Sequence, residues 1–409
     1  MTLTSFLTDV SSEMLSSLLP VFLFSVLGVR TTFIGLIEGI AEATASLFKL
    51  FSGWLSDKMG KRKNLAVFGY SLSALAKLFL WIVTTWVGVL IIRFVDRIGK
   101  GLRTSPRDAL ISDSVEEERR GFAFGLHRAG DTAGAVVGIG IALIVIVLAQ
   151  KGGDDLTRST FQAIVLVSAI PAFLAVLVLS LGAVEIPPKS ALEDSDPVET
   201  KLLSLPAHNR RYRAFLLISM LFMLGNFSDA FLILRANSSG LGVVGILIMM
   251  MTFNIVYALI STPAGAVSDR LGRRWVLILG WIIFACVYLG FAFTSTGWQS
   301  WLLMAVYGCY YGLTEGVSRA YIGDLTPSQQ RGSAYGLYYA VIGVMAFPAS
   351  FLAGVLWQGI GTWDGFGEGA PFMLGACTAI LAALLLMLHP AFKNERAVEN
   401  EVMERGEPI

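Results

Sequence analysis

The chain has 409 residues, of which 55% are hydrophobic and 15% charged, and its formal net charge is +1. Soluble domains carry about 25% charged residues, so this composition excludes an ordinary soluble protein and indicates a membrane protein. The net charge points to no charged partner, and we expect no nucleic acid among the partners. All three cysteines fall in apolar runs, which favours neither a disulfide framework nor a metal site, and we expect no cofactor.

Apolar runs of about 20 residues are long enough to cross a membrane as helices. Twelve such runs follow one another, at residues 6–27, 33–55, 64–84, 87–112, 121–149, 161–184, 213–235, 240–267, 274–294, 299–322, 333–357 and 371–389. They predict an all-α membrane protein with twelve transmembrane helices in two six-helix bundles. The first run carries Asp9 and Glu13, unlike the apolar core of a signal peptide, so we expect no cleavable leader.

Lysine and arginine in short loops predict which side of the membrane each loop faces. The loops after even-numbered spans are basic, with Lys58, Lys61, Arg62, Lys63, Arg119, Arg120, Arg270, Arg273, Arg274 and Arg331. The loops after spans 3, 9 and 11 carry no Lys or Arg. The pattern predicts that both termini are cytoplasmic, in a plasma membrane or a bacterial inner membrane.

A polar stretch with four prolines separates the two halves. It cannot bury enough apolar area to fold alone. We therefore predict an N-terminal bundle at 1–184, a cytoplasmic linker at 185–212, a C-terminal bundle at 213–392 and a charged cytoplasmic tail at 393–409.

Charged residues inside spans are costly, by roughly 2.5–3.5 kcal/mol on insertion scales, and usually face a cavity or a partner. Asp9 and Glu13 lie four residues apart in span 1, and Glu38 and Glu42 lie four apart in span 2, so each pair occupies one helix face. Two such stripes on one cavity can share a proton. Two alternatives stay open: Asp9 lies at the cytoplasmic interface, or Glu38 and Glu42 pair structurally with Lys49 or with bases of span 4.

Span 4 has the densest charge. Its residues Arg93, Asp96, Arg97 and Lys100 share one helix face by their three- and four-residue spacing. That face must line a cavity or pair with neighbouring spans. Farther along the span, we expect Arg103 and Arg107 to extend towards the cytoplasm.

Spans 5, 7 and 10 carry the remaining candidates for substrate binding or proton coupling: His127, Arg128, Asp131, Asn226, Asp229, Glu315 and Arg319. A lone histidine in a span is either a proton relay or a hydrogen-bonded structural residue. Tyrosines crowd spans 10 and 11 and either line an amphipathic pocket or pack in the core: Tyr307, Tyr310, Tyr311, Tyr338 and Tyr339.

A loop motif occurs twice, 212 positions apart, as GWLSDKMGKRK at 53–63 and GAVSDRLGRR at 265–274. Its matching residues are Gly53, Asp57, Gly60 and Arg62 in the first copy, and Gly265, Asp269, Gly272 and Arg274 in the second. We interpret each glycine before the aspartate as a point of close helix approach, and each aspartate as part of a latch that pairs with the arginine when the cytoplasmic side closes. A basic loop that only sets orientation is the alternative.

A second match has nearly the same offset, DSVEEERRGFAFG at 113–125 against DLTPSQQRGSAYG at 324–336. Two landmarks at one spacing indicate that the chain is two copies of one unit. In a membrane protein built in this way, the binding site lies between the copies near the middle of the bilayer.

The loop motif resembles the signature of the major facilitator superfamily, G-x-x-x-D-x-x-G-R-[KR], with Lys61 where arginine is usual. The text DRIGKGLRTSPRDALI is similar to a bacterial branch of that superfamily whose substrates are unassigned. The resemblance implies alternating access between two bundles. Arg97 and Gly101 are similar to a span-4 motif associated with proton coupling, and Gly130, Gly134 and Gly138 to the span-5 motif of antiporters, although Ala135 replaces its proline and Ile139 a glycine.

We therefore predict a secondary active transporter, and no enzyme, that exports a small amphipathic or charged solute in exchange for protons, embedded in the bilayer as a monomer. Uptake, uncoupled facilitation and movement of a metal cation or metal chelate are the alternatives within transport. A membrane sensor is the alternative outside it, but the chain carries no soluble output domain. In the coupling hypothesis, Arg97 lies within about 4–6 Å of an acidic partner, and Glu38→Gln and Glu42→Gln separate proton movement from solute movement.

Overall fold

The computed structural model describes residues 1–59, 62–116, 120–150, 153, 155–185, 209–326 and 331–392. Every regular element in these ranges is helical. The N-terminal half contains α1 (Thr2–Ser16), α2 (Leu19–Val21), a π-helical turn (Phe22–Val26), α3 (Thr31–Met59), α4 (Arg62–Leu78), a 3₁₀ turn (Phe79–Trp81), α5 (Trp86–Asp113), α6 (Arg120–Gln150) and α7 (Arg158–Gly182). The C-terminal half contains α8 (Arg210–Gly225), α9 (Ala230–Ser238), α10 (Val243–Leu271), α11 (Arg273–Phe293), α12 (Gly297–Leu325), α13 (Arg331–Gln358), α14 (Ala370–Leu388) and a 3₁₀ turn (Pro390–Phe392).

These helices make twelve spans, as predicted, because α1, α2 and the π-helical turn form span 1 while α8 and α9 form span 7. Nine spans of the described chain are long and apolar enough to cross a membrane by those criteria alone. The three that do not meet them are α3, α5 and α12, which carry many of the charges singled out above. Their charges need a polar surround that lipid does not provide.

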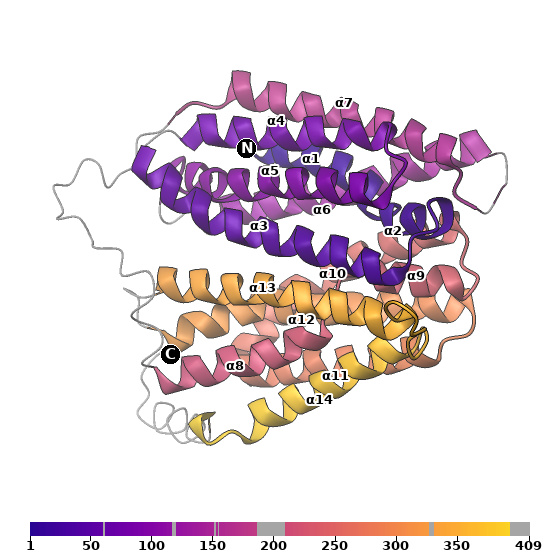
Figure 1. Cartoon of the computed structure of the whole chain (residues 1–409). Helices are drawn as coiled ribbons and strands as arrows, with labels where there is room; N and C mark the ends of the chain where they lie inside the picture. Colours follow the sequence, from indigo (N-terminus) through magenta and orange to yellow (C-terminus); the bar gives the residue numbers. More distant parts are fainter. Residues whose placement is uncertain are drawn as a thin grey trace.

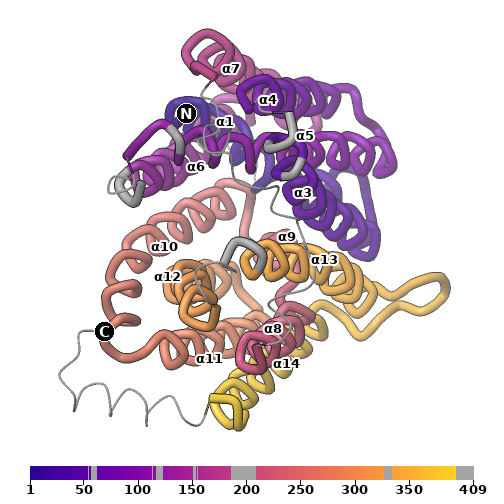
Figure 2. Tube along the Cα trace, turned by 90° about the vertical axis from the view of Figure 1, so that its left-hand side faces the viewer, coloured from indigo at the N-terminus to yellow at the C-terminus, as the bar shows by residue number. Residues whose placement is uncertain are grey.

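The two halves form separate bundles, the N-terminal one above the C-terminal one in Figure 1. Each helix pair that packs in the first bundle recurs in the second: α1 on α6 and α7 corresponds to α8 on α13 and α14, and α3 and α4 on α5 correspond to α10 and α11 on α12. The bundles meet along two seams, α3 against α13 and α6 against α10, which are visible end-on in Figure 2. Pseudo-twofold symmetry exchanges these seams.

Small residues let the helices of the first bundle approach closely. A Cβ added at Gly134 would lie 2.5 Å from the carbonyl oxygen of Phe6, and one at Gly138 would lie 2.4 Å from that of Val10. Both distances are shorter than any tolerated contact, so α6 packs on α1 only because these residues are glycines. The glycines of span 5 therefore form a packing surface for span 1.

We call the end of the bundles with the repeated loops the motif end, and the opposite end the far end. Hydrogen bonds join the bundles at the far end of the α3–α13 seam. The Thr31 amide donates to Gln358 Oε1 (2.7 Å), Arg30 Nη2 donates to the Gln358 carbonyl (2.7 Å), and the Thr32 hydroxyl donates to the carbonyl of Gly359 (2.6 Å). The far end of this seam is therefore closed.

The predicted domain boundaries differ from the helices by a few residues. Helix α8 begins at Arg210, inside the stretch assigned to the linker. Glu185, the first residue of that stretch, accepts hydrogen bonds from the amides of Arg62 (2.7 Å) and Lys63 (3.0 Å) and thereby caps α4. Residues 186–208 and 393–409, which cover the rest of the linker and the tail, lie outside the described residues.

Candidate functional site

A cavity of about 490 Å³ lies between the bundles. Helices α1, α3, α4 and α5 form one wall, and α8, α9, α10, α12 and α13 form the other. Sites for small molecules usually have volumes of roughly 300–1,000 Å³. The cavity is therefore large enough for a small solute, and it lies where the internal repeat predicts a binding site.

The N-terminal wall is densely charged. Its acidic residues are Asp9, Glu13, Glu38, Glu42 and Asp96, and its basic residues are Lys77, Arg93, Arg97, Lys100 and Arg103. Eight of these ten were selected from the sequence, and the structure brings all eight to one surface. Lys77 and Arg103 are the additions.

Glu38 and Arg93 form the best-buried ion pair of this wall. Arg93 Nη2 lies 3.0 Å from Glu38 Oε1 and 2.9 Å from Oε2. The side chains are only 8% and 10% exposed. Of the partners left open for Glu38, the structure selects a base of span 4, while the ammonium of Lys49 lies 4.8 Å from the centre of the Tyr339 ring.

Arg97 holds its acids more loosely. Its Nη1 lies 3.6 Å from Glu42 Oε1, and its Nε lies 3.9 Å from Asp96 Oδ2. The Glu42 side chain is 43% exposed, towards the cavity. Glu42 thus supplies the acidic partner that the coupling hypothesis places near Arg97. The role of the pair in proton coupling stays a prediction. One guanidinium lies between two carboxylates, so Arg97 keeps an acidic neighbour if Glu42 takes up a proton.

Lys77 was missed by the sequence reasoning. Its ammonium donates to the hydroxyls of Ser12 (2.7 Å) and Ser11 (3.3 Å) on α1. A single lysine inside the otherwise apolar run 64–84 was the available signal, since a buried charge in a span requires polar partners.

The prediction that Arg103 and Arg107 extend towards the cytoplasm is wrong. The Arg103 guanidinium is buried 4.4 Å above the ring of Tyr70, an arrangement that favours a cation. Arg107 donates to the Ser5 hydroxyl (3.1 Å) and pairs with Asp108 at 2.8 Å. Both side chains point into the bundle because α1 and α4 offer them hydroxyl and aromatic partners.

His127 and Asp131 lie outside the cavity lining. His127 is buried, with Nε2 3.4 Å from the Ser5 hydroxyl and 3.7 Å from Asp131 Oδ2. The Ser5 hydroxyl also lies 3.4 Å from that of Tyr70. These contacts join α1, α4 and α6 in a polar cluster inside the N-terminal bundle. The contacts fit the structural interpretation of His127, and its relay role stays a prediction.

The C-terminal wall is almost uncharged. Asp229 is its one charged residue within the described chain. Its carboxylate accepts hydrogen bonds from the hydroxyls of Tyr307 (2.9 Å) and Tyr311 (3.4 Å). The Asn226 amide donates to the Tyr310 hydroxyl at 3.3 Å.

The structure divides the predicted tyrosine cluster. Tyr311 lines the cavity, whereas Tyr307, Tyr310 and Tyr338 are buried in the core. Tyr339 is less deeply buried and receives Lys49 over its ring. The pocket and core interpretations therefore each apply to part of the set.

Arg128, Glu315 and Arg319 form a bridge across the motif-end half of the α6–α10 seam. Arg128 on α6 pairs with Glu315 on α12 (2.8 Å) and donates to the Tyr257 hydroxyl on α10. Glu315 also pairs with Arg319, one turn farther along α12 (2.6 Å). These residues connect the two bundles and do not line the cavity.

The second copy of the loop motif is held within the C-terminal bundle. Asp269 pairs with Arg273 (3.4 Å), where the sequence analysis expected Arg274. Arg273 also pairs with Asp324 (2.5 Å). Arg274 instead donates to carbonyls at the end of α14 and just after it, those of Leu386 (3.0 Å), Met387 (2.7 Å) and Phe392 (2.7 Å).

The glycines of the motif differ in what they do. Gly272 has φ of 87°, which a residue with a side chain rarely adopts, and it allows the turn from α10 into α11. The prediction of close helix approach is wrong at Gly265, where an added Cβ would meet nothing within 4 Å. At Gly53 an added Cβ would lie 3.6 Å from the Ser105 side chain, which is an ordinary contact. The side chain of Asp57 and all of Gly60 lie outside the described residues, and the backbone amide of Arg62 binds Glu185. The latch role stays a prediction.

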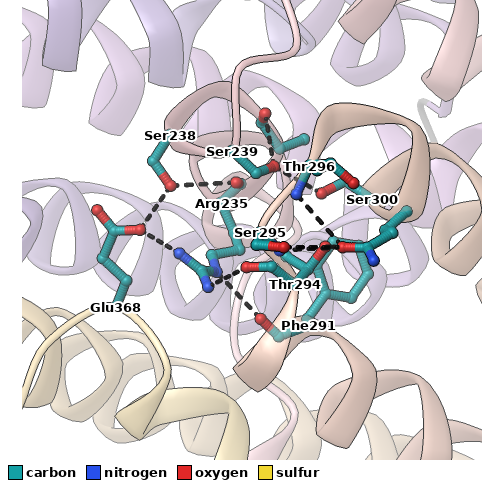
Figure 3. A network of polar contacts seen from close by, with 11 residues as sticks. Arg235, Ser238, Ser239, Phe291, Thr294, Ser295, Thr296, Ser300 and Glu368 are labelled. Carbon is teal, nitrogen blue, oxygen red and sulfur yellow. Dashed lines mark hydrogen bonds and ion pairs between the residues drawn. The ribbon is translucent and has the colours of Figure 1, made fainter.

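A second polar network closes the far end of the C-terminal bundle (Figure 3). Arg235 donates to the carbonyls of Phe291 (3.0 Å) and Thr294 (2.6 Å) and pairs with Glu368. Glu368 also accepts from the Ser238 hydroxyl (2.7 Å). The network fixes α9 to the turn after α11 and to the loop before α14.

Comparison with known proteins agrees with this architecture. The family model of the Major Facilitator Superfamily matches residues 1–250 and 232–406. The chain belongs to the major facilitator superfamily. An uncharacterized MFS-type transporter of Methanocaldococcus jannaschii is 37% identical over 390 residues, which cover 94% of this chain and 92% of that protein. The chain is thus a transporter-family protein and not an enzyme.

Solved structures of this superfamily share the fold. The crystal structure of the nucleoside transporter NupG has a TM-score of 0.75 at 18% identity and covers 96% of this chain and 98% of its own. That of a D-xylose-proton symporter has a TM-score of 0.76 at 16% identity and covers 96% and 97%. At these identities the likeness shows the fold alone.

Proposed function

We propose that this superfamily member is a secondary active transporter that exports a small amphipathic or charged solute through the central cavity by alternating access, in exchange for protons. Both bundles line the cavity, so a change in their mutual orientation changes the side from which a bound solute is reached. The far-end hydrogen bonds and the Arg128 bridge are the contacts that such a change would break or form.

The observation that carries the proton coupling is the contrast between two neighbouring ion pairs. Glu38 is locked onto Arg93, whereas Glu42 faces the cavity and shares Arg97 with Asp96. A proton taken up by Glu42 leaves Arg97 beside Asp96, so no unpaired charge is created. Glu42 is therefore the better proton carrier, and Glu38 the better structural partner.

The direction of transport rests on the span-5 glycines, which are similar to those of family antiporters and pack α6 against α1. Uptake and uncoupled facilitation remain alternatives. The alternative of a metal cation lacks a supporting cluster, since no three His, Cys, Asp or Glu side chains are grouped for a metal in the described chain. We further propose that both termini are cytoplasmic, in a plasma membrane or bacterial inner membrane, and that the transporter is a monomer.

The test uses the full chain reconstituted in vesicles with an imposed pH gradient and an internal pH-sensitive dye. A solute panel should contain a compound that collapses the gradient only when the protein is present. Glu42→Gln should abolish that proton movement while solute exchange at equal pH continues. Asp155→Asn, which neutralises an exposed carboxylate in the loop after α6, is the control and should behave as the parent chain.

Two results would contradict the proposal. One is solute accumulation without any proton movement, which would indicate another driving ion or none. The other is an unchanged pH profile in Glu42→Gln, which would make the span-2 acids structural and would move the search to Asp131 or Asp229.

A further inference from the structure

We infer that Asp229 is the docking point for a positively charged amine on the transported solute, so that the solute class is an organic cation. This inference rests on the proposed transport function, because it assigns the substrate class of the same cavity. Three features of the described residues support it: an interrupted helix, a carboxylate without a basic partner, and aromatic neighbours.

The interruption of span 7 exposes Asp229 to the cavity. Helix α8 ends at Gly225 and α9 begins at Ala230, and residues 226–229 between them line the cavity. Asp229 occupies the N-cap position of α9, yet its side chain makes no capping hydrogen bond. The carboxylate turns instead towards α12. Broken helices of this kind form the substrate sites of many transporters, because they offer polar groups in the middle of the membrane.

The carboxylate of Asp229 has only neutral partners. It accepts from the two phenol hydroxyls of Tyr307 and Tyr311, and within the ranges the structure describes no Lys or Arg nitrogen lies within 4 Å of it. Charged side chains inside a membrane usually face a cavity or pair with another polar group. Glu38, Glu42 and Asp96 of the N-terminal wall each face an arginine. Asp229 has no arginine or lysine partner. A cationic ligand supplies the missing charge.

The surroundings of Asp229 suit an organic cation better than a metal ion. Phe227, Phe253 and Tyr311 line the same cavity, and the rings of Phe253 and Tyr311 meet edge to face with centroids 5.3 Å apart. Aromatic faces attract ammonium groups, whereas hard metal ions require several oxygen ligands. One carboxylate among aromatic side chains therefore selects an amine with an apolar body.

The opposite wall carries five acids and five bases, so it adds no net charge. Two of its arginines, Arg93 and Arg97, already face carboxylates. The preference for a cation therefore comes from Asp229 itself and from its aromatic neighbours.

The test measures binding to the purified full chain in detergent, without any gradient. The probes are two pairs of matched shape and opposite charge, phenethylamine with 3-phenylpropionate and tetraphenylphosphonium with tetraphenylborate. In at least one pair the cation should bind at least about tenfold more tightly than the anion, which corresponds to roughly 1.4 kcal/mol. Asp229→Asn should weaken binding of that cation by at least about tenfold, and Asp229→Glu should restore most of it.

The control is Asp155→Asn, which makes the same chemical change at an exposed position of the loop after α6 and should bind the cation as the parent chain does. Thermal melting without ligand shows whether each variant is folded. If Asp229→Asn does not fold, the cation affinity of Asp229→Glu tests the role of the carboxylate. Absence of binding by both cations, tighter binding of the anions, or unchanged cation affinity in folded Asp229→Asn would overturn the inference. Because no gradient is present, cation binding through Asp229 without proton movement in vesicles would refute the coupling and leave this inference intact.

Discussion

The two bundles share one fold but differ in the walls that they present to the cavity. The N-terminal wall carries ten charged residues, and the C-terminal wall carries Asp229 as its one charged residue within the described chain. The helix pairs that build the bundles nevertheless correspond one to one. Helix packing in a membrane depends on small residues and shape, so the duplicated fold tolerates different polarity on its inner surfaces. The comparison teaches that symmetry of the fold does not imply symmetry of role.

The largest effect should follow from a change in the charged wall that leaves an arginine without its acid. Glu38→Gln should lower the free energy of unfolding in detergent by about 3–5 kcal/mol, because Arg93 is then a buried charge without a partner. Glu42→Gln, in a pair that is partly exposed, should cost about 1 kcal/mol or less. Equal losses in the two variants, measured by denaturant titration, would show that the wall does not divide into a structural and a mobile pair.

In the C-terminal bundle, substitutions at the far end should lower the free energy of unfolding more than substitutions in the cavity wall. Arg235→Ala removes three hydrogen-bonding contacts, one of them to a carboxylate, and should lower the free energy of unfolding by about 2–3 kcal/mol. Arg235→Lys keeps a charge for Glu368 but cannot reach both carbonyls with a planar fork. The stability of Arg235→Lys should therefore lie between those of the parent chain and Arg235→Ala. A lysine variant as unstable as the alanine variant would contradict the contribution of Glu368.

The bridge between the bundles is the next test. Arg128→Ala removes the contact of α6 with Glu315 and should favour the state open at the motif end about two- to fivefold, the range expected for an exposed ion pair. The measurement is the labelling rate of Ser46→Cys in the cavity wall, by a reagent added from the motif end, in a chain whose native cysteines are replaced by serine. Arg319→Ala breaks a pair inside α12 and should have a smaller effect. The reverse order would show that the bridge does not hold the bundles together.

The smallest effect should come from the second copy of the loop motif. Asp269→Asn removes an exposed pair that spans the turn from α10 to α11, worth roughly 0.5 kcal/mol, while Arg273 keeps Asp324. Asp57→Asn should instead leave insertion intact, slow transport and favour opening towards the cytoplasm, as the latch hypothesis requires. Cysteine accessibility from each side distinguishes the two copies, and unchanged accessibility together with unchanged transport in Asp57→Asn rejects the latch.

The architecture could be predicted from the sequence because each span is an apolar run of sufficient length and the repeated loops mark the halves. The charged wall could be predicted because charges in spans are costly and must face a cavity or a partner. The ion-pair partner of each charged residue could not be predicted. Whether Glu38 or Glu42 faces Arg93 depends on the rotation of α3 against α5, which only the packed bundle sets.

Three further features could not be predicted, because tertiary contacts or backbone geometry set them or because their local signal is weak. Arg103 stays inside the bundle because Tyr70, on another helix, offers its ring. The interruption of span 7 has only a weak signal, the polar residues Asn226, Ser228 and Asp229 in an apolar run, whose side chains compete with the helix for backbone groups. Arg273 takes the place expected for Arg274 because Gly272, at positive φ, sets the direction in which α11 begins.

The interruption of span 7 has a counterpart in span 1. Helix α1 ends at Ser16 and α2 begins at Leu19, close to 212 positions before the start of α9, so the first span of each half is divided at the corresponding place. The detached pieces contact each other at the far end, where Ser25 donates to Asn237 at 3.4 Å. Arg235 ties α9 to its own bundle, and the stacked rings of Phe22 and Phe161 tie the N-terminal piece to α7. The contact between the first spans of the two halves is therefore made by short helical pieces that are each anchored in their own bundle.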